Sequence, residues 1–120
     1  MMNLNTVLLF SEEPKKLIEF YKKVLNVKPA WEGGDFTGFK LGSGFLGIGP
    51  HSKVHGKNTS PERMMFNIEV DDIEKEFKRI KNLKAKVIQE PYTPGEEATI
   101  KIATFADVDN NFFQINTKME

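Results

Sequence analysis

Two histidines, His51 and His55, lie four positions apart in the sequence. On a helix, this spacing would place both imidazole rings on one face, where they could bind one metal ion. The surrounding segment argues against a helix, because Pro50 and Gly56 enclose the pair and polar residues lie between. A catalytic dyad would also lack a partner carboxylate before Glu62. We therefore interpret both histidines as solvated loop residues.

The composition excludes several other kinds of site. The sequence has no Cys, which rules out zinc–thiolate sites, thiol catalysis and disulfides. Glycines at positions 42, 44, 47 and 49 resemble a phosphate-binding loop, but no helix start follows them to hold the anion. We interpret them as strand positions that keep one face thin, with room for a partner strand, a second subunit or a ligand.

Charge and hydropathy limit the partners and the location. The 17 basic and 17 acidic side chains cancel, and they are interleaved along the expected helices, so no broad positive field is available for nucleic acid. The apolar run from Val7 to Phe10 is too short for a signal peptide or a membrane span. We expect a cytoplasmic protein without nucleic-acid or membrane partners.

The first half of the chain predicts a strand, a helix and three further strands. A β-rich run over Leu4–Phe10 leads into Ser11, an N-cap candidate, and then into a helix over Pro14–Leu25. The helix carries an apolar stripe and ends at Asn26, which tolerates the left-handed conformation. Glycine-containing turns separate three short strands, expected at 27–31, 36–41 and 45–48.

The second half repeats this plan. A strand over Arg63–Val70 precedes Asp71 and Asp72, which cap a helix over Ile73–Leu83 with an apolar face. Three more strands are expected at 86–92, 99–105 and 112–118. We predict one domain over 1–120, with a first module at about 3–50, an exposed linker at about 51–62 and a second module at about 63–120. The two copies superpose at an offset of either 59 or 60 residues.

Three segments carry a resemblance to a known family: EFYKKVLNV, FNIEVDDI and ATFADVDNNFFQI. Together the chain resembles the glyoxalase/bleomycin-resistance/extradiol-dioxygenase superfamily, also called the vicinal oxygen chelate fold. Val108 and Asn110 depart from it, standing where Pro and Gly are usual. The resemblance implies an α+β fold in which two tandem βαβββ modules form a curled mixed sheet cup. It places the helices outside and a ligand inside, and it favours a homodimer.

The resemblance also implies where a metal would be bound. Metalloenzymes of the family place His or Glu on the first and fourth strand of each module, which here gives Thr6 or Asn5, Gly47, Met65 and Gln114. None of these side chains is a competent ligand for a catalytic divalent ion, which needs imidazole, thiolate or carboxylate donors. We therefore predict no metal ligands and no cofactor.

Strand alternation predicts the residues that line the cup. Met65, Asn67 and Glu69 share one face of their strand, and Phe112 and Gln114 share a face of the last strand. Together with Trp31, they form the predicted ligand-binding set. Glu69 is the one carboxylate expected there, either as a general base if it is partly buried or as a rim carboxylate in water.

The sequence favours binding over catalysis. The first hypothesis is a metal-independent small-molecule binder of the antibiotic-sequestering kind, although the neutral chain does not suit a strongly cationic antibiotic. The alternative is a lactoylglutathione-lyase-like or dioxygenase-like enzyme with non-standard or no metal ligands, including a metal-free isomerase that uses Glu69. A third possibility, a domain that serves only assembly, would follow if the cup were filled by its own aromatic side chains.

Overall fold

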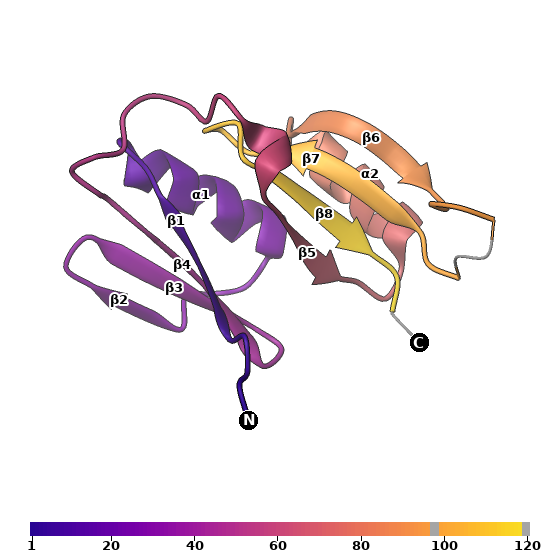
Figure 1. Cartoon of the computed structure of the whole chain (residues 1–120), viewed down its shortest axis with the longest axis horizontal. Coiled ribbons are helices and arrows are strands. Elements are labelled where there is room, and N and C mark those ends of the chain that lie inside the picture. Colours follow the sequence, from indigo (N-terminus) through magenta and orange to yellow (C-terminus); the bar gives the residue numbers. More distant parts are fainter. Residues whose placement is uncertain (97–98, 119–120) are drawn as a thin grey trace. The chain divides into compact units, whose positions relative to one another are not determined.

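The structure, a computed structural model, describes residues 1–96 and 99–118 and divides into two compact units, Met1–Lys57 and Asn58–Glu120 (Figure 1). The first unit contains β1 (Thr6–Phe10), α1 (Pro14–Leu25), β2 (Trp31–Gly33), β3 (Phe36–Leu41) and β4 (Gly44–Gly49). The second contains the 3-10 helix η1 (Pro61–Arg63), β5 (Met65–Glu69), α2 (Ile73–Asn82), β6 (Lys86–Tyr92), β7 (Ile102–Ala106) and β8 (Phe112–Asn116). The predicted pair of βαβββ modules is confirmed. That the two units work as one domain around a shared cup stays a prediction.

Each unit builds its sheet in the same way. The strand order is β1-β4-β3-β2 in the first unit and β5-β8-β7-β6 in the second, and the first strand of each runs parallel to the last. The other neighbouring strands are antiparallel, as the short glycine-containing turns of the first unit require. In each unit the helix packs against one face of its sheet, and the opposite face points away from that helix (Figure 1). We call this opposite face the strand face.

Both predicted helices form, with differences at their ends. Asn26 adopts the left-handed conformation at φ 53° as predicted, and Asp72 accepts a hydrogen bond from the backbone N–H of Lys75 at 3.1 Å. Ser11 is not the N-cap of α1: Glu13 holds that position, and the Ser11 hydroxyl accepts from the Glu13 N–H at 3.0 Å within the preceding turn. Leu83, predicted as the last residue of the second helix, is instead the C-cap of α2 and is 39% exposed. Among the described residues, no helix is long and apolar enough to cross a membrane.

Several strand boundaries differ from the prediction. β2 starts at Trp31, where the predicted strand ended, because Pro29 offers no N–H for a ladder over 27–30. β1 begins at Thr6 and β7 at Ile102, so both strands are shorter than expected. Within the predicted exposed linker, Pro61 is buried at the start of η1.

A tight loop at Asp107–Asn111 joins β7 to β8. The Asp107 carboxylate is 6% exposed and accepts hydrogen bonds from the backbone N–H groups of Asp109 and Asn111, each at 2.9 Å. Asn110 takes a positive φ of 63°, as its side chain permits. The loop thereby fixes where β8 begins, next to the edge strand β5.

Candidate functional site

The second unit brings five of the six predicted ligand-binding residues onto its strand face. β5 and β8 pair in parallel with Met65 opposite Phe112 and Asn67 opposite Gln114. Because side chains alternate along a strand, these four residues and Glu69 point to the same side of the sheet. β5 is the edge strand, so this group of side chains lies along one border of the face.

The opposite face of this sheet holds the core, as the alternation predicted. Phe66 and Phe113 stack with ring centroids 6.1 Å apart, and Phe105 stacks on Phe113 at 5.7 Å. Phe77 of α2 lies 5.4 Å from Phe105 between ring centroids. With this aromatic stack under α2, the register of β5 and β8 is fixed, because a slip by one residue would bring polar side chains under the helix.

Three polar side chains form a hydrogen-bonded row across the strand face. The side-chain amide of Asn67 donates from Nδ2 to Oε1 of Gln114 at 3.0 Å, and Nε2 of Gln114 donates to Oγ1 of Thr104 at 3.0 Å. Thr104 pairs with Gln114 between β7 and β8 and is 4% exposed, whereas Asn67 is exposed. We call Asn67, Gln114 and Thr104 the amide row; it runs from an exposed end on the edge strand to a buried end.

Thr104 was missing from the predicted site. The signal that could have found it is its place as the polar residue of an otherwise apolar strand, IATFA, where it is buried. A buried hydroxyl needs a hydrogen-bond partner, which favours a polar neighbour on an adjacent strand.

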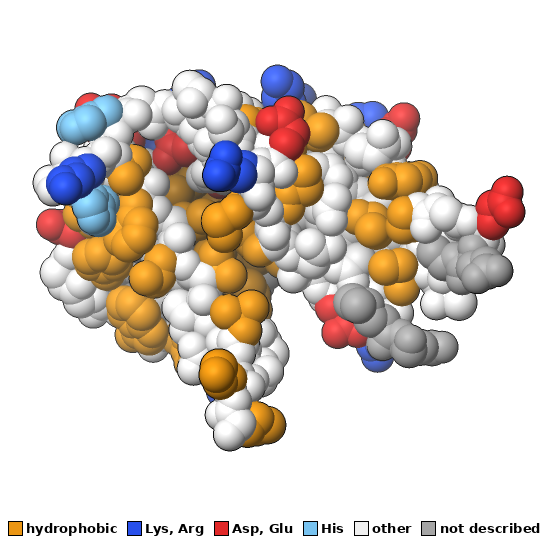
Figure 2. Space-filling model, in the orientation of Figure 1, with side chains coloured by type: hydrophobic (Ala, Val, Ile, Leu, Met, Phe, Trp, Pro, Cys, Tyr) orange, Lys and Arg blue, Asp and Glu red, His pale blue; other side chains and the backbone are white. Residues whose placement is uncertain are grey.

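The rows on either side of the amide row differ in polarity. On one side lie Met65, which is 40% exposed, and Phe112, which is 8% exposed. On the other side lie Glu69, which is exposed, and Asn116, which is 3% exposed and donates to the Thr117 carbonyl at 2.7 Å. Figure 2 shows a face of this unit that is largely white, the colour of backbone and uncharged polar side chains, with separate hydrophobic patches.

The general-base interpretation of Glu69 requires a partly buried side chain, which Glu69 does not have. Its side chain is exposed, and among residues 1–96 and 99–118 it forms no ion pair. The rim-carboxylate interpretation therefore fits its surroundings better.

The sixth predicted residue, Trp31, belongs to the first unit. It pairs with Gly38 between β2 and β3, and its indole ring covers that glycine so closely that an added Cβ at Gly38 would overlap it. The ring is 46% exposed, so one part contacts the sheet and another faces outward. Trp31 is therefore described within the first unit, whereas the other five residues belong to the second unit.

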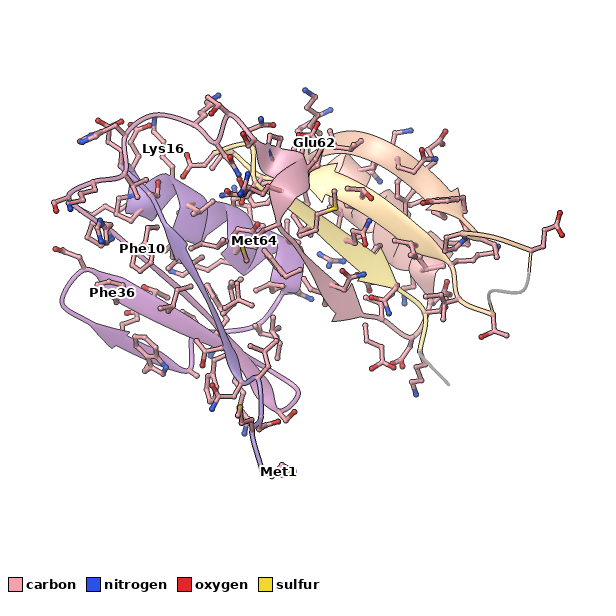
Figure 3. The ribbon with its side chains drawn as sticks, in the orientation of Figure 1. Met1, Phe10, Lys16, Phe36, Glu62 and Met64 are labelled. Atoms are coloured by element: carbon pink, nitrogen blue, oxygen red, sulfur yellow. The ribbon has the colours of Figure 1, made fainter. Side chains whose placement is uncertain are left out.

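In the first unit, large apolar side chains cover two of the four glycine positions where free room was predicted, Gly47 and Gly49, whereas a Cβ at Gly42 would meet no described atom within 4 Å. Phe36 covers Gly49, and Cδ2 of Leu8 would lie 2.9 Å from a Cβ at Gly47. Phe10 meets Phe36 edge to face at 6.2 Å between ring centroids (Figure 3). Figure 2 shows hydrophobic side chains gathered over this part of the first unit. The glycines therefore let large apolar side chains lie flat on the sheet.

Substitution of Gly38 tests this arrangement. Gly38→Ala should push the Trp31 indole off the sheet into water, which shifts its fluorescence to longer wavelength and increases quenching by acrylamide. Gly33→Ala is the matched control, because a Cβ there meets no atom within 4 Å in the described part of the chain. Trp31 is the single tryptophan, so both readings belong to it. Unchanged emission in Gly38→Ala would contradict the placement of the ring.

The histidines lie on a loop as predicted, but one has a carboxylate neighbour. Nδ1 of His55 lies 3.8 Å from Oε1 of Glu12, and the other Glu12 oxygen accepts from the Gly56 N–H at 2.8 Å. The prediction that no carboxylate lies near the histidines before Glu62 is therefore wrong, because the fold brings Glu12 to His55 from a distant part of the sequence. The ring of His51 instead packs edge to face on Phe10 at 5.2 Å, so the two histidines do not converge.

The pairing of the strands shows how the residues at the implied metal-ligand positions lie in each sheet. Alternation places Thr6, rather than Asn5, on the same face as Gly47, and β4 pairs Gly47 with Leu8. In the second unit the β5 neighbour of Gln114 is Asn67, and Met65 lies two residues before Asn67 on the same face. Over residues 1–96 and 99–118, no group of three or more His, Asp or Glu side chains could hold a metal ion.

Comparison with solved structures supports the fold. The chain matches a glyoxalase/bleomycin resistance protein/dioxygenase family enzyme from Burkholderia phytofirmans PsJN with a TM-score of 0.76 and 20% identity, over 98% of this chain and 100% of that one. A glyoxalase-related enzyme from Fulvimarina pelagi gives 0.77 and 12% identity, over 98% and 89%. The fosfomycin resistance protein FosX from Listeria monocytogenes gives 0.70 and 13% identity, over 99% and 93%. The TM-scores show that these proteins share a fold with this chain, and at such low identities the likeness shows the fold alone.

No curated protein matches the sequence. The model of the Glyoxalase/Bleomycin resistance protein/Dioxygenase superfamily matches residues 3–115, which include both sheets and both helices. The chain therefore belongs to the glyoxalase/bleomycin resistance protein/dioxygenase superfamily.

Proposed function

We propose that this protein binds an organic small molecule on the strand face of its second unit and does so without a metal ion. The observation that carries the proposal is the amide row. At Gln114, where the family resemblance would place a metal ligand, the chain has an amide that is already hydrogen-bonded to Asn67 and Thr104.

The chemistry of these donors supports metal independence. An amide oxygen is a weak, neutral ligand, and the Gln114 oxygen already accepts from Asn67. Met65 offers a thioether, and Asn67 offers a second amide. The described strand partners of Gln114 are Asn67 and Thr104, and Glu69 lies two residues beyond Asn67, opposite Asn116. Such a set suits hydrogen bonding to an organic ligand better than coordination of zinc or iron.

The relatives are consistent with a binding function. The family includes proteins described by bleomycin resistance, and one structural neighbour is described as a fosfomycin resistance protein. An antibiotic-sequestering role would need contact surface and hydrogen bonds more than a catalytic group. With a formal net charge of +0, the chain offers no overall attraction for a strongly cationic ligand.

Metal analysis tests the proposal directly. We expect the purified protein, digested and assayed for zinc, nickel, manganese and iron, to contain far less than one metal ion per chain. A content close to one per chain would contradict the proposal and favour the enzyme alternative, a lactoylglutathione-lyase-like or dioxygenase-like activity. Protein incubated with each ion and then desalted is the control for metal lost during purification.

A thermal-shift screen tests binding itself. A ligand that binds only the folded state should raise the melting temperature as its concentration exceeds its Kd. We expect organic compounds in the screen to do so equally in the presence and absence of a chelator. Loss of the shift on adding chelator would contradict metal independence. We also propose a cytoplasmic homodimer, and size-exclusion chromatography with light scattering would test that association.

A further inference from the structure

The amide row has more hydrogen-bonding capacity than it uses. Asn67 and Gln114 each have one N–H that is engaged in the row and a second N–H for which residues 1–96 and 99–118 provide no acceptor. The Thr104 hydroxyl accepts from Gln114, but within the described residues no acceptor is assigned to its own proton. Thr104 is 4% exposed, so water has little access to that proton.

Turning both amides by half a turn gives a second arrangement with the same outline. Thr104 would then donate to the Gln114 oxygen, and the Gln114 nitrogen would donate to the Asn67 oxygen. Both hydrogen bonds of the row are kept, and the buried Thr104 proton gains an acceptor. The terminal torsions of Asn and Gln are broad and roughly two-fold, so the backbone need not move. The row can therefore run in either direction.

The direction of the row decides what its exposed end offers. In the arrangement described, the Asn67 oxygen is free to accept, and one N–H remains beside it on the same amide. In the reversed arrangement, both Asn67 N–H groups are free to donate. Because Thr104 can either donate or accept, it supports both directions from the buried end.

The surroundings of Asn67 limit the ligand further. Met65, 40% exposed, provides an apolar surface two residues before Asn67 on the edge strand. The exposed carboxylate of Glu69, two residues beyond Asn67, would repel an anion. The row itself carries no charge, so a ligand charge placed on it would lose hydration without a partner.

We infer that the amide row is a reversible recognition element for an uncharged, flat ring that carries an amide-type edge, as in a lactam, imide or ring carboxamide. The ring lies on Met65, and its C=O and N–H meet Asn67. The ligand sets the direction of the row, which Gln114 transmits to Thr104. This inference rests on the proposed binding function and names its ligand class.

A matched pair of probes tests the inference. 2-Quinolinone presents a flat ring with a lactam C=O and N–H, and N-methyl-2-quinolinone keeps the ring and C=O without the N–H. Titration of ¹⁵N-labelled protein should shift the side-chain amide signals of Asn67 and Gln114 with 2-quinolinone. The N-methyl compound should bind about tenfold more weakly, because one hydrogen bond of the pair is lost.

Variants at the two ends of the row separate recognition from folding. Asn67→Ala should weaken 2-quinolinone binding about tenfold, and Thr104→Val should weaken it severalfold because Gln114 loses its buried partner. Thr104→Ser keeps a hydroxyl and should restore binding. Gln114→Glu accepts from both neighbours, so it should hold the Asn67 oxygen outward and favour the lactam over its N-methyl analogue still more. Backbone amide spectra check that each variant is folded.

Three outcomes would overturn the inference. These are equal binding of the two probes, Asn67→Ala binding within twofold of the wild type, or no shift of either side-chain amide at millimolar probe. If the inference fails while other compounds raise the melting temperature without metal, the proposed function stands and only the ligand class is wrong. If a bound metal is found as well, both fail.

Discussion

Replacement of Phe105 by alanine should lower the free energy of unfolding by about 3–5 kcal/mol. Phe105 is 0% exposed, and its ring lies 5.4 Å from that of Phe77 and 5.7 Å from that of Phe113 between centroids. Truncation removes the contacts that join α2 to β7 and β8 and leaves a cavity that the sheet cannot close without moving strands. Urea unfolding followed by far-UV circular dichroism measures the loss.

Ile88→Ala on β6 is the control for this prediction. Ile88 is 37% exposed, so its truncation should change the free energy of unfolding by less than about 1 kcal/mol. If Phe105→Ala had an equally small effect, the aromatic stack would not be the core of the second unit, and the strand face would have been assigned to the wrong side of the sheet.

The same variant also tests the prediction of a single domain. Trp31 lies in the first unit and Phe105 in the second, so Trp31 fluorescence reports unfolding of the unit that is not mutated. If the units unfold together, the fluorescence and circular dichroism transitions should move to the same lower urea concentration. A fluorescence transition that stays at the wild-type urea concentration would show two independent units.

The sequence predicted the elements well where one local signal decided them. The three-and-four spacing of apolar residues, with Pro14 and Asp72 at the starts, placed both helices to within one residue at each end. The failures lie where two local signals compete. The Ser11 side chain can either cap a helix or close a turn. Here its hydroxyl accepts from the Glu13 N–H and closes the turn, and Glu13 is the N-cap of α1.

The candidate site was only partly predictable, because its partners are distant in the sequence. Alternation placed Asn67 and Gln114 on inward faces, but their hydrogen bond joins residues 47 positions apart and depends on the pairing register of β5 with β8. Alternation alone does not give that register. The approach of Glu12 to Gly56, 44 positions apart, was missed for the same reason.

Asp107→Ala should destabilise the protein by about 2–4 kcal/mol, which is large for a loop residue. The carboxylate is 6% exposed and accepts from the backbone N–H groups of Asp109 and Asn111 and from the Asn111 side chain at 3.0 Å. Without it, two backbone donors in a partly buried turn lose their acceptor, at about 1–3 kcal/mol each. Urea unfolding followed by circular dichroism measures this loss too.

Two variants of the same loop separate the carboxylate from the loop as a whole. Asp107→Asn keeps one acceptor oxygen but turns an NH₂ group toward the backbone donors. Val108→Ala is the control, because Val108 is 39% exposed. The free energy of unfolding that Asp107→Asn loses should fall between the losses of Asp107→Ala and Val108→Ala. The reverse order would contradict the role of the Asp107 carboxylate as the acceptor.

Because β8 starts at Phe112, directly after this loop, Asp107→Ala should also broaden the side-chain amide signal of Gln114. A sharp, unshifted Gln114 signal in that variant would mean that the pairing of β8 with β5 and β7 positions Gln114 without the loop.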